Sequence, residues 1–443
     1  MRKLLFCLIL FTTPAFANLS LIRDAETEKF LRELSQPIFK EAGLNSQNIK
    51  IYIVNDDSIN AFVSGGQNVF INTGLIRKYN TPNALIGVIA HETGHITAGH
   101  LARSAEGAKE AQNAMLLSYL LGIGAAISGA PDAGAAVILG GSQSAQRLYM
   151  KFTRTQEEAA DAHAIEYLDK MRYPADGLIK LLEFFEMQMV GYKDQLDEYL
   201  LSHPISRKRI ELIKTRTAHK NFSDKKTNQK LQPIMNRVLA KLAGFIDQPD
   251  ETLKKYKNHH DENANYTKSI ALFKKGKISE SLELLDPIIE KNPRDGFLHE
   301  LKGQILFESG KIQDSILAYN QALKLLSLID SPTTKISFAS AILSLKTTDN
   351  ELINLAIQNL EEAKNFEDEN PFLFKQLANA YSRKNDEARS LLALAEFNLL
   401  IGEKEKCQKY AKEAKEKLQK SDKMEIMRAD DLLELAKDKK SDH

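Results

Sequence analysis

The stretch HETGH, residues 91–95, constrains this chain more than any other part of its sequence. A helix turns by about 100° per residue, so His91 and His95 project from one face and can bind a single metal ion. Glu92 lies beside them, where a carboxylate that is not a ligand can take a proton from a metal-activated water. A motif this short also occurs by chance, and the alternative is a solvated helix face with two surface histidines.

The length of 443 residues predicts two or three domains. Lys and Arg together number 60 and Asp and Glu number 59, which leaves a formal net charge of +1. Whole-chain electrostatics therefore give no reason to expect binding to nucleic acid or to an anionic membrane.

The N-terminus has the three parts of a secretory signal. Arg2 and Lys3 precede the apolar run Leu4 to Phe11, and Ala15-Phe16-Ala17 supplies small residues for cleavage. We expect residues 1–17 to be removed and the mature protein to lie in the periplasm. The alternative is a retained membrane anchor, for which the apolar run is short. Removal would leave Cys407 alone, so no internal disulfide is expected and stability must come from the core and any metal.

The region before the motif predicts a small sheet beside helices. Residues 20–42 have the apolar spacing of a helix, and residues 50–55 alternate like a strand. Residues 59–76 contain two short strand patterns around Gly65-Gly66, which indicates a hairpin. Thr81-Pro82 then begins a largely apolar helix that leads to His91. We expect a mainly α-helical protein whose first domain is an α+β peptidase fold with a short β-sheet.

Residues 115–141 are apolar and rich in Gly and Ala. About 16 of these residues precede the break at Pro131-Asp132, whereas about 20 are needed to span a bilayer. The composition favours close helix packing or a mobile apolar lid. We therefore expect a buried or lid-like segment, with membrane insertion as the alternative.

Zinc in a peptidase requires three protein ligands and one open position. The extended pattern HExxHxxGxxH would need Gly and His where the chain has Ala98 and Leu101. His100 follows His95 by five residues, about 140° around a continuous helix, so we expect it to point away from the metal.

A better third ligand is Glu157, in the sequence RTQEEAADAHAIEYL. Thr155 and Glu158 have the spacing of a capping box, which predicts that a helix starts here. Glu157 and Asp161 are four residues apart and share a face. Glu157 can then bind the metal while Asp161 orients a ligand histidine through its ring N–H. The alternative is an acidic first turn favoured by the helix dipole.

His203 precedes Pro204 in the sequence LSHPISRKRIELI. A residue before proline is biased toward extended backbone, so His203 is predicted on a loop that leads into a helix from about Ser206. An exposed turn histidine is the alternative.

Beyond a polar connection at residues 218–232, the chain has a helical pattern to its end. FKKGKISESL from Phe273 and FESGKIQDSI from Phe307 repeat with a period of 34, the length of a tetratricopeptide repeat (TPR). The clearest repeats lie at about 265–330 and 390–420. We predict a peptidase domain over residues 18–225 and a helical TPR superhelix over residues 226–443, with an irregular helical bundle as the alternative.

Four motifs together resemble a known family. HETGH, EEAAD from Glu157, NAFVSGGQNVFINTGLI from Asn60 and SHPISRKRI from Ser202 occur in the order found in HtpX-like and CAAX-protease-like gluzincin metallopeptidases. The arrangement of this chain, with a signal peptide before the peptidase motifs and repeats after them, is similar to that of periplasmic members of the family. Those members act in quality control and assembly of outer-membrane β-barrel proteins. The peptidase motifs are specific, whereas the repeats are generic.

The resemblance implies one zinc ion held by His91, His95 and Glu157, with Glu92 and Asp161 as catalytic residues. It implies that His203 is a regulatory or fourth zinc ligand, although a role as transition-state donor stays open. It also matches Arg209 to the arginine of the same motif.

The resemblance matches four residues to an edge strand that pairs with substrate in the family, namely Asn60, Ala61, Phe62 and Val63. Such pairing uses backbone hydrogen bonds and therefore depends little on the sequence of the substrate. The resemblance thus predicts a zinc endopeptidase that cleaves misfolded or stalled proteins. Its repeats would dock clients or the outer-membrane β-barrel assembly machinery, and peripheral membrane association is possible. The alternatives are a chaperone or assembly scaffold with secondary proteolysis and a membrane-inserted metalloprotease.

Overall fold

The computed structural model describes residues 20–127, 131–191, 203–345, 348–420 and 422–437. These residues form two compact units. One unit is Phe30–Met235, and the other comprises the described residues of Met1–Lys29 and Asn236–His443. The predicted signal peptide lies outside the described residues. The predicted domain boundary after residue 225 stays a prediction.

The described residues are mainly α-helical with a short β-sheet, as expected, and this sheet has four strands. The strands are β1 (Leu21–Ile22), β2 (Ile51–Val54), β3 (Ala61–Ser64) and β4 (Asn68–Asn72). In the first unit β2 pairs in parallel with β4, and β3 pairs antiparallel with β4 in the register Ala61↔Ile71. The turn of this hairpin contains Gly65 and Gly66 with φ of 59° and 97°, a left-handed backbone that glycine adopts without strain.

Helix α1 (Ala25–Glu41) buries the apolar face that its sequence predicts, from Phe30 to Phe39. After β4, the short helix α2 (Thr73–Lys78) leads to α3 (Pro82–Thr97). The Thr81 hydroxyl accepts a hydrogen bond from the backbone N–H of Ala84 and caps α3, as the Thr-Pro pair suggested. Most of α3 is buried, so its motif is part of the core.

Helix α3 lies close to two partners, α5 (Pro131–Lys170) and α6 (Asp176–Gly191). A Cβ atom added at Gly94 would lie 2.5 Å from the carbonyl oxygen of Ala160 in α5. A Cβ atom added at Gly87 would lie 2.7 Å from the backbone nitrogen of Leu178 in α6. These glycines therefore allow the three helix backbones to approach closely.

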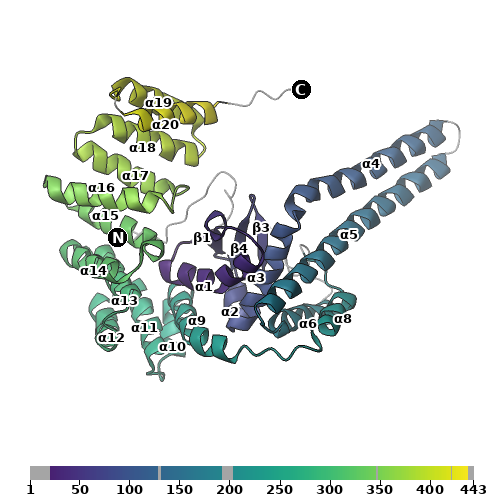
Figure 1. The fold of residues 1–443 in the computed structure, drawn as a ribbon, viewed down its shortest axis with the longest axis horizontal. Helices are drawn as coiled ribbons and strands as arrows, with labels where there is room; N and C mark the ends of the chain where they lie inside the picture. Colours follow the sequence, from purple (N-terminus) through teal and green to yellow (C-terminus); the bar gives the residue numbers. More distant parts are fainter. Residues whose placement is uncertain (1–19, 128–130, 192–202, 346–347, 421, 438–443) are drawn as a thin grey trace. The chain divides into compact units, whose positions relative to one another are not determined.

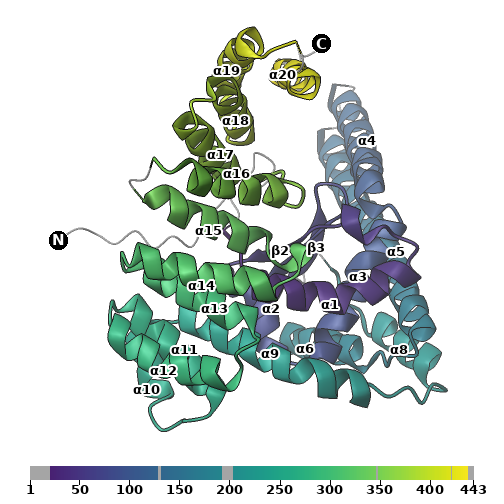
Figure 2. The same cartoon turned by 60° about the vertical axis from the view of Figure 1, so that its left-hand side comes forward.

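Helices α4 (His100–Ile127) and α5 lie side by side, as both views show (Figures 1 and 2). The predicted helix start at Thr155 is wrong, because α5 is continuous through this residue. The Thr155 hydroxyl donates to the carbonyl oxygen of Lys151 one turn earlier and caps nothing.

Residues 115–141 were expected to be a buried or lid-like segment, and the buried alternative is wrong for the described part of this stretch. Its helices contact each other along one side and leave large apolar side chains exposed on the others, namely Met115, Leu116, Leu117, Tyr119, Leu120, Leu121, Val137 and Leu139. None of the helices in the described part of the chain has the length and apolar character that crossing a membrane requires.

The remaining helices of this unit are α8 (Arg207–Thr217) and the first half of α9 (Lys225–Ile246). The predicted connection over residues 218–232 is shorter than expected, because α9 begins at Lys225. Ser206 caps α8 by accepting from the backbone N–H of Arg209, which agrees with the predicted start.

The second unit is a succession of paired helices, as the period of 34 predicted (Figure 1). Gly276 and Gly310 each follow the first helix of a pair with φ of 74° and 82°, which explains why both repeats have glycine at this position. The helices are α10 (Pro249–Lys255), α11 (Glu262–Lys274), α12 (Ile278–Lys291), α13 (Gly296–Glu308), α14 (Ile312–Leu325), α15 (Pro332–Ser344), α16 (Asn350–Lys364), α17 (Pro371–Arg383), α18 (Glu387–Leu400), α19 (Lys404–Lys417) and α20 (Lys423–Leu435).

We expect Gly94→Ala to destabilise the unit Phe30–Met235 by about 1–3 kcal/mol, because the added methyl group overlaps the backbone of α5. Urea unfolding measures this change. Gly140→Ala is the matched control, since Gly140 is also helical but has no atom within 4 Å of an added Cβ. The control should be stabilised by about 0.5–1 kcal/mol, and an equal gain in Gly94→Ala would contradict the close crossing.

Candidate active site

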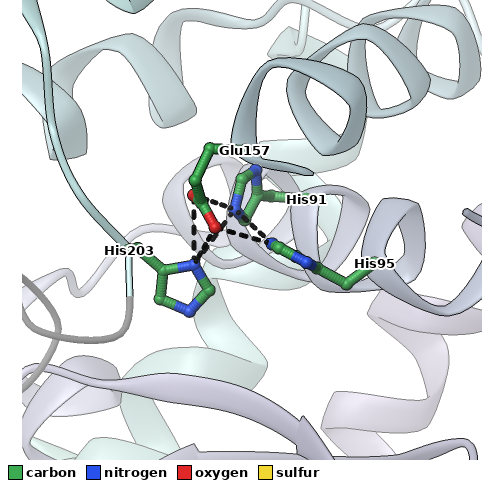
Figure 3. Close-up of side chains that lie close together, drawn as sticks. All are labelled: His91, His95, Glu157 and His203. Atoms are coloured by element: carbon green, nitrogen blue, oxygen red, sulfur yellow. Dashed lines mark hydrogen bonds and ion pairs between the residues drawn. The ribbon is translucent and has the colours of Figure 1, made fainter. Parts of the chain in front are cut away.

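His91 and His95 extend from one face of α3, and Glu157 approaches them from α5 (Figure 3). The Nε2 atoms of the two histidines are 3.1 Å apart. The Glu157 carboxylate oxygens lie 3.3 Å from Nε2 of His91 and 3.2 Å from Nε2 of His95. The helix pair thus brings Glu157 to two histidines that precede it by more than 60 residues in the sequence.

His203 completes the group from the non-helical segment before α8 (Figure 3). Its Nδ1 atom lies 3.4 Å from Nε2 of His91 and 3.2 Å from each oxygen of Glu157. His203 is buried, which excludes the exposed-turn alternative.

The separations of these atoms fit a zinc site. The four residues His91, His95, Glu157 and His203 each offer one ligand atom within 4.8 Å of the others. Four ligands about 2.05 Å from a tetrahedral zinc ion would lie about 3.3 Å from one another. The contacts given above join five of the six pairs of these residues and measure between 3.1 and 3.4 Å.

Asp161 lies one turn beyond Glu157, where its Oδ1 is 2.9 Å from Nδ1 of His91. Arg209 from α8 links both carboxylates. Its Nε and Nη2 donate to Asp161 at 2.7 and 2.9 Å, and its Nη1 is 2.9 Å from Glu157. All three side chains are at most 3% exposed, so this ion-pair network is shielded from water.

Burial would raise the pKa of the Glu157 carboxyl, but the charge of His203 and hydrogen bonds from the histidines hold that pKa well below its usual value. Arg209 likewise lowers the pKa of Asp161 despite burial. With Glu92 ionised and the histidines neutral, as ligands to a metal must be, three carboxylates and one guanidinium give the site a net charge of minus two. A divalent cation neutralises this charge.

Glu92 projects from α3 beside the ligand group and is almost fully buried. One carboxylate oxygen is 3.6 Å from Nε2 of His203, and neither oxygen receives a hydrogen bond from the described residues. Burial raises the pKa of this carboxyl. A buried carboxylate without a hydrogen-bond donor, next to a metal site, is suited to accept a proton.

The predicted edge strand corresponds to β3, which begins at Ala61 and pairs only with β4 among the described strands. Asn60 immediately precedes β3. The carbonyl oxygen of Asn60 accepts a hydrogen bond from the backbone N–H of Asn72. Phe62 stacks on Phe70 with ring centroids 5.0 Å apart. Helix α3 packs beside β3, so this strand lies near the helix that carries the ligands.

His100 lies outside the ligand group, but the expected reason is wrong. Helix α3 ends at Thr97, and Gly99 has φ of 64°, so His100 starts a new helix. Its Nδ1 atom lies 2.8 Å from Nδ1 of His95. Our sequence reasoning missed this contact because it assumed a continuous helix, and the glycine just before His100 was the available signal.

We expect Arg209→Met to destabilise the unit Phe30–Met235 by about 3–5 kcal/mol, because it leaves two buried carboxylates without their cation. Urea unfolding of the zinc-loaded protein tests this. The neighbouring Lys208 is 76% exposed and pairs with Glu158 at the surface. Lys208→Met should change stability little, and similar losses in both variants would contradict a special role for the buried network.

Comparison with known proteins agrees with this chemistry. Residues 24–217 match the profile of peptidase family M48. The chain is 25% identical to the β-barrel assembly-enhancing protease of Yersinia pestis over 331 residues, which cover 73% of this chain and 67% of the relative. It is 24% identical to the protein of that name from Escherichia coli strain K12 over 388 residues, or 86% of this chain and 77% of the relative.

A putative β-barrel assembly-enhancing protease from Vibrio cholerae is 24% identical over 293 residues, or 63% of this chain and 58% of that protein. Members of family M48 are zinc-dependent, and the four converging side chains give this chain the means to hold the metal. Residues 24–217 thus match peptidase family M48, and the protein that contains them is a zinc metalloprotease.

Proposed function

We propose that this protein is a periplasmic zinc endopeptidase that acts on misfolded or stalled proteins during assembly of outer-membrane β-barrels. The buried group of His91, His95, Glu157 and His203 is the observation that supports the peptidase activity. The names of the relatives from Yersinia and Escherichia support the place of that activity in β-barrel assembly. The predicted signal peptide, residues 1–17, supports export.

Zinc held by His91, His95 and Glu157 would supply an acidified water and an electrophile for the scissile carbonyl. Glu92 takes the proton of the attacking water and returns it to the leaving amine. The Asp161 carboxylate lies 2.9 Å from Nδ1 of His91, where it would orient the ring so that Nε2 faces the metal. An extended substrate adds to the edge of β3 at residues 60–63, so that backbone pairing rather than side-chain recognition holds it.

We expect Glu92→Gln to lower cleavage of an unfolded casein by about 10²–10⁴-fold, because the amide cannot take the proton. Zinc content, measured on the same samples, should stay near that of the wild type, since Glu92 is not among the four proposed ligands. Cleavage at the wild-type rate with zinc retained would contradict the assignment of Glu92 as the base.

His203 is proposed as a latch that fills the fourth zinc position at rest. Its support is the placement of Nδ1 among the other ligand atoms from a non-helical segment. We expect His203→Ala to raise basal casein cleavage severalfold, because the open position becomes available to water. The partly exposed His163 of α5 provides the control His163→Ala, which should cleave like the wild type. A large fall in cleavage by His203→Ala would favour the transition-state donor instead.

A second candidate function is a chaperone or assembly scaffold with secondary proteolysis. Its support is the long series of paired helices, which we propose to be TPRs that dock clients or the β-barrel assembly machinery. The two functions separate in the Glu92→Gln variant, because a scaffold would still promote client assembly when cleavage is lost. Peripheral membrane association is also proposed, with the exposed apolar side chains of α4 and α5 as its support.

A further inference from the structure

Each histidine of the metal motif has a partner at its second ring nitrogen. Nδ1 of His91 faces the Asp161 carboxylate at 2.9 Å, and Nδ1 of His95 faces Nδ1 of His100 at 2.8 Å. His100 is only 6% exposed, and its ring meets that of His95 edge-on, with centroids 4.9 Å apart and planes at 73°. This contact is therefore enclosed and directional.

The chemistry of imidazole fixes the direction of this hydrogen bond. A neutral imidazole that binds a metal through Nε2 must carry its proton on Nδ1. His95 turns Nε2 toward His91 and Glu157, so its Nδ1–H points at His100. His100 can accept only with an unprotonated Nδ1, which places its own proton on Nε2.

We propose that His100 is a positioning residue, which accepts the Nδ1–H of His95 and so holds that ligand in the tautomer and orientation that zinc requires. This inference rests on the proposed ligand set. His100 acts through His95 and touches neither the metal nor the substrate.

The backbone around His100 is built to hold this position. The left-handed Gly99 turns the chain between α3 and α4, so that a residue five positions after His95 returns to it. Gln156 of α5 donates from Nε2 to the His100 carbonyl oxygen at 3.3 Å. Gln156 precedes the ligand Glu157, so the same stretch of α5 anchors both a ligand and this partner.

The two ligand histidines differ in the strength of their support. Asp161 is a carboxylate paired with Arg209, whereas His100 is a neutral acceptor. Partners of this kind typically change metal affinity by about 10–100-fold. Loss of the His100 acceptor should therefore weaken zinc binding without abolishing it.

The test compares His100→Leu, which removes the acceptor, with His100→Asn, whose Oδ1 can take the place of Nδ1. Zinc affinity of the full-length protein is measured by competition with a chromophoric chelator. We expect His100→Leu to bind zinc about 10–100-fold more weakly and His100→Asn to recover most of the loss. In saturating zinc, kcat of His100→Leu should fall with little change in KM, because substrate contacts are intact.

Two controls separate this inference from the proposed site. His91→Ala must lose zinc binding in the same assay, and if it does not, the ligand set itself is wrong. His163→Leu, on a histidine away from the ligand group, should bind zinc like the wild type. Wild-type zinc affinity in His100→Leu would overturn the inference, as would equal losses in His100→Leu and His100→Asn, which would indicate a purely structural role.

Discussion

The close crossing of α3 and α5 is the contact on which the metal site depends. Gly94 lies next to His95, and the Ala160 carbonyl that faces it lies one turn beyond Glu157. Because a bulkier residue at position 94 would separate the backbones, the distance between the histidines and the carboxylate depends on the lack of a side chain at Gly94. Core packing, which tolerates little change in volume, thus determines the geometry of the ligands.

Burial of so many charges is the second constraint. Glu92, Glu157 and Asp161 lie in a part of the core where an unpaired carboxylate is very costly. Arg209 compensates one of these charges, and zinc would compensate the remaining two. Metal binding should therefore contribute directly to the stability of this unit, because a ligand that binds only the folded state shifts the folding equilibrium.

Much of the fold could be predicted from local sequence. The capped start at Thr81, the Gly-Gly hairpin and the glycines of the helical repeats each require a particular backbone conformation, and the structure has it. The errors concern longer-range features. Thr155 has the sequence spacing of a helix cap, but it lies within α5, where no helix begins. The exposure of residues 115–121 depends on what packs against them, which composition does not reveal.

For the metal site, the sequence predicts which residues share a helix but not how the separate segments meet. Local spacing places His91, Glu92 and His95 on one helix, but only the fold brings Glu157 and His203 to them. The contact between His95 and His100 was missed because one left-handed glycine redirects the chain. The spacing of residues predicts the direction of their side chains only within one continuous helix. A glycine within a helical pattern can end that helix, so the prediction does not extend past it.

The contacts of α8 also limit how a latch at His203 could open. Arg209 holds Asp161 and Glu157 and donates from Nη1 to the Pro204 carbonyl at 2.9 Å, so Pro204 and α8 are fixed to the carboxylates. Movement of α8 would break the ion pairs of Arg209 with both carboxylates, whereas rotation at His203 would leave those ion pairs intact. Pro204 thus lies between α8, which is fixed to the carboxylates, and His203, the proposed latch. Opening of this latch would require the chain to turn at His203 while the other zinc ligands keep their positions.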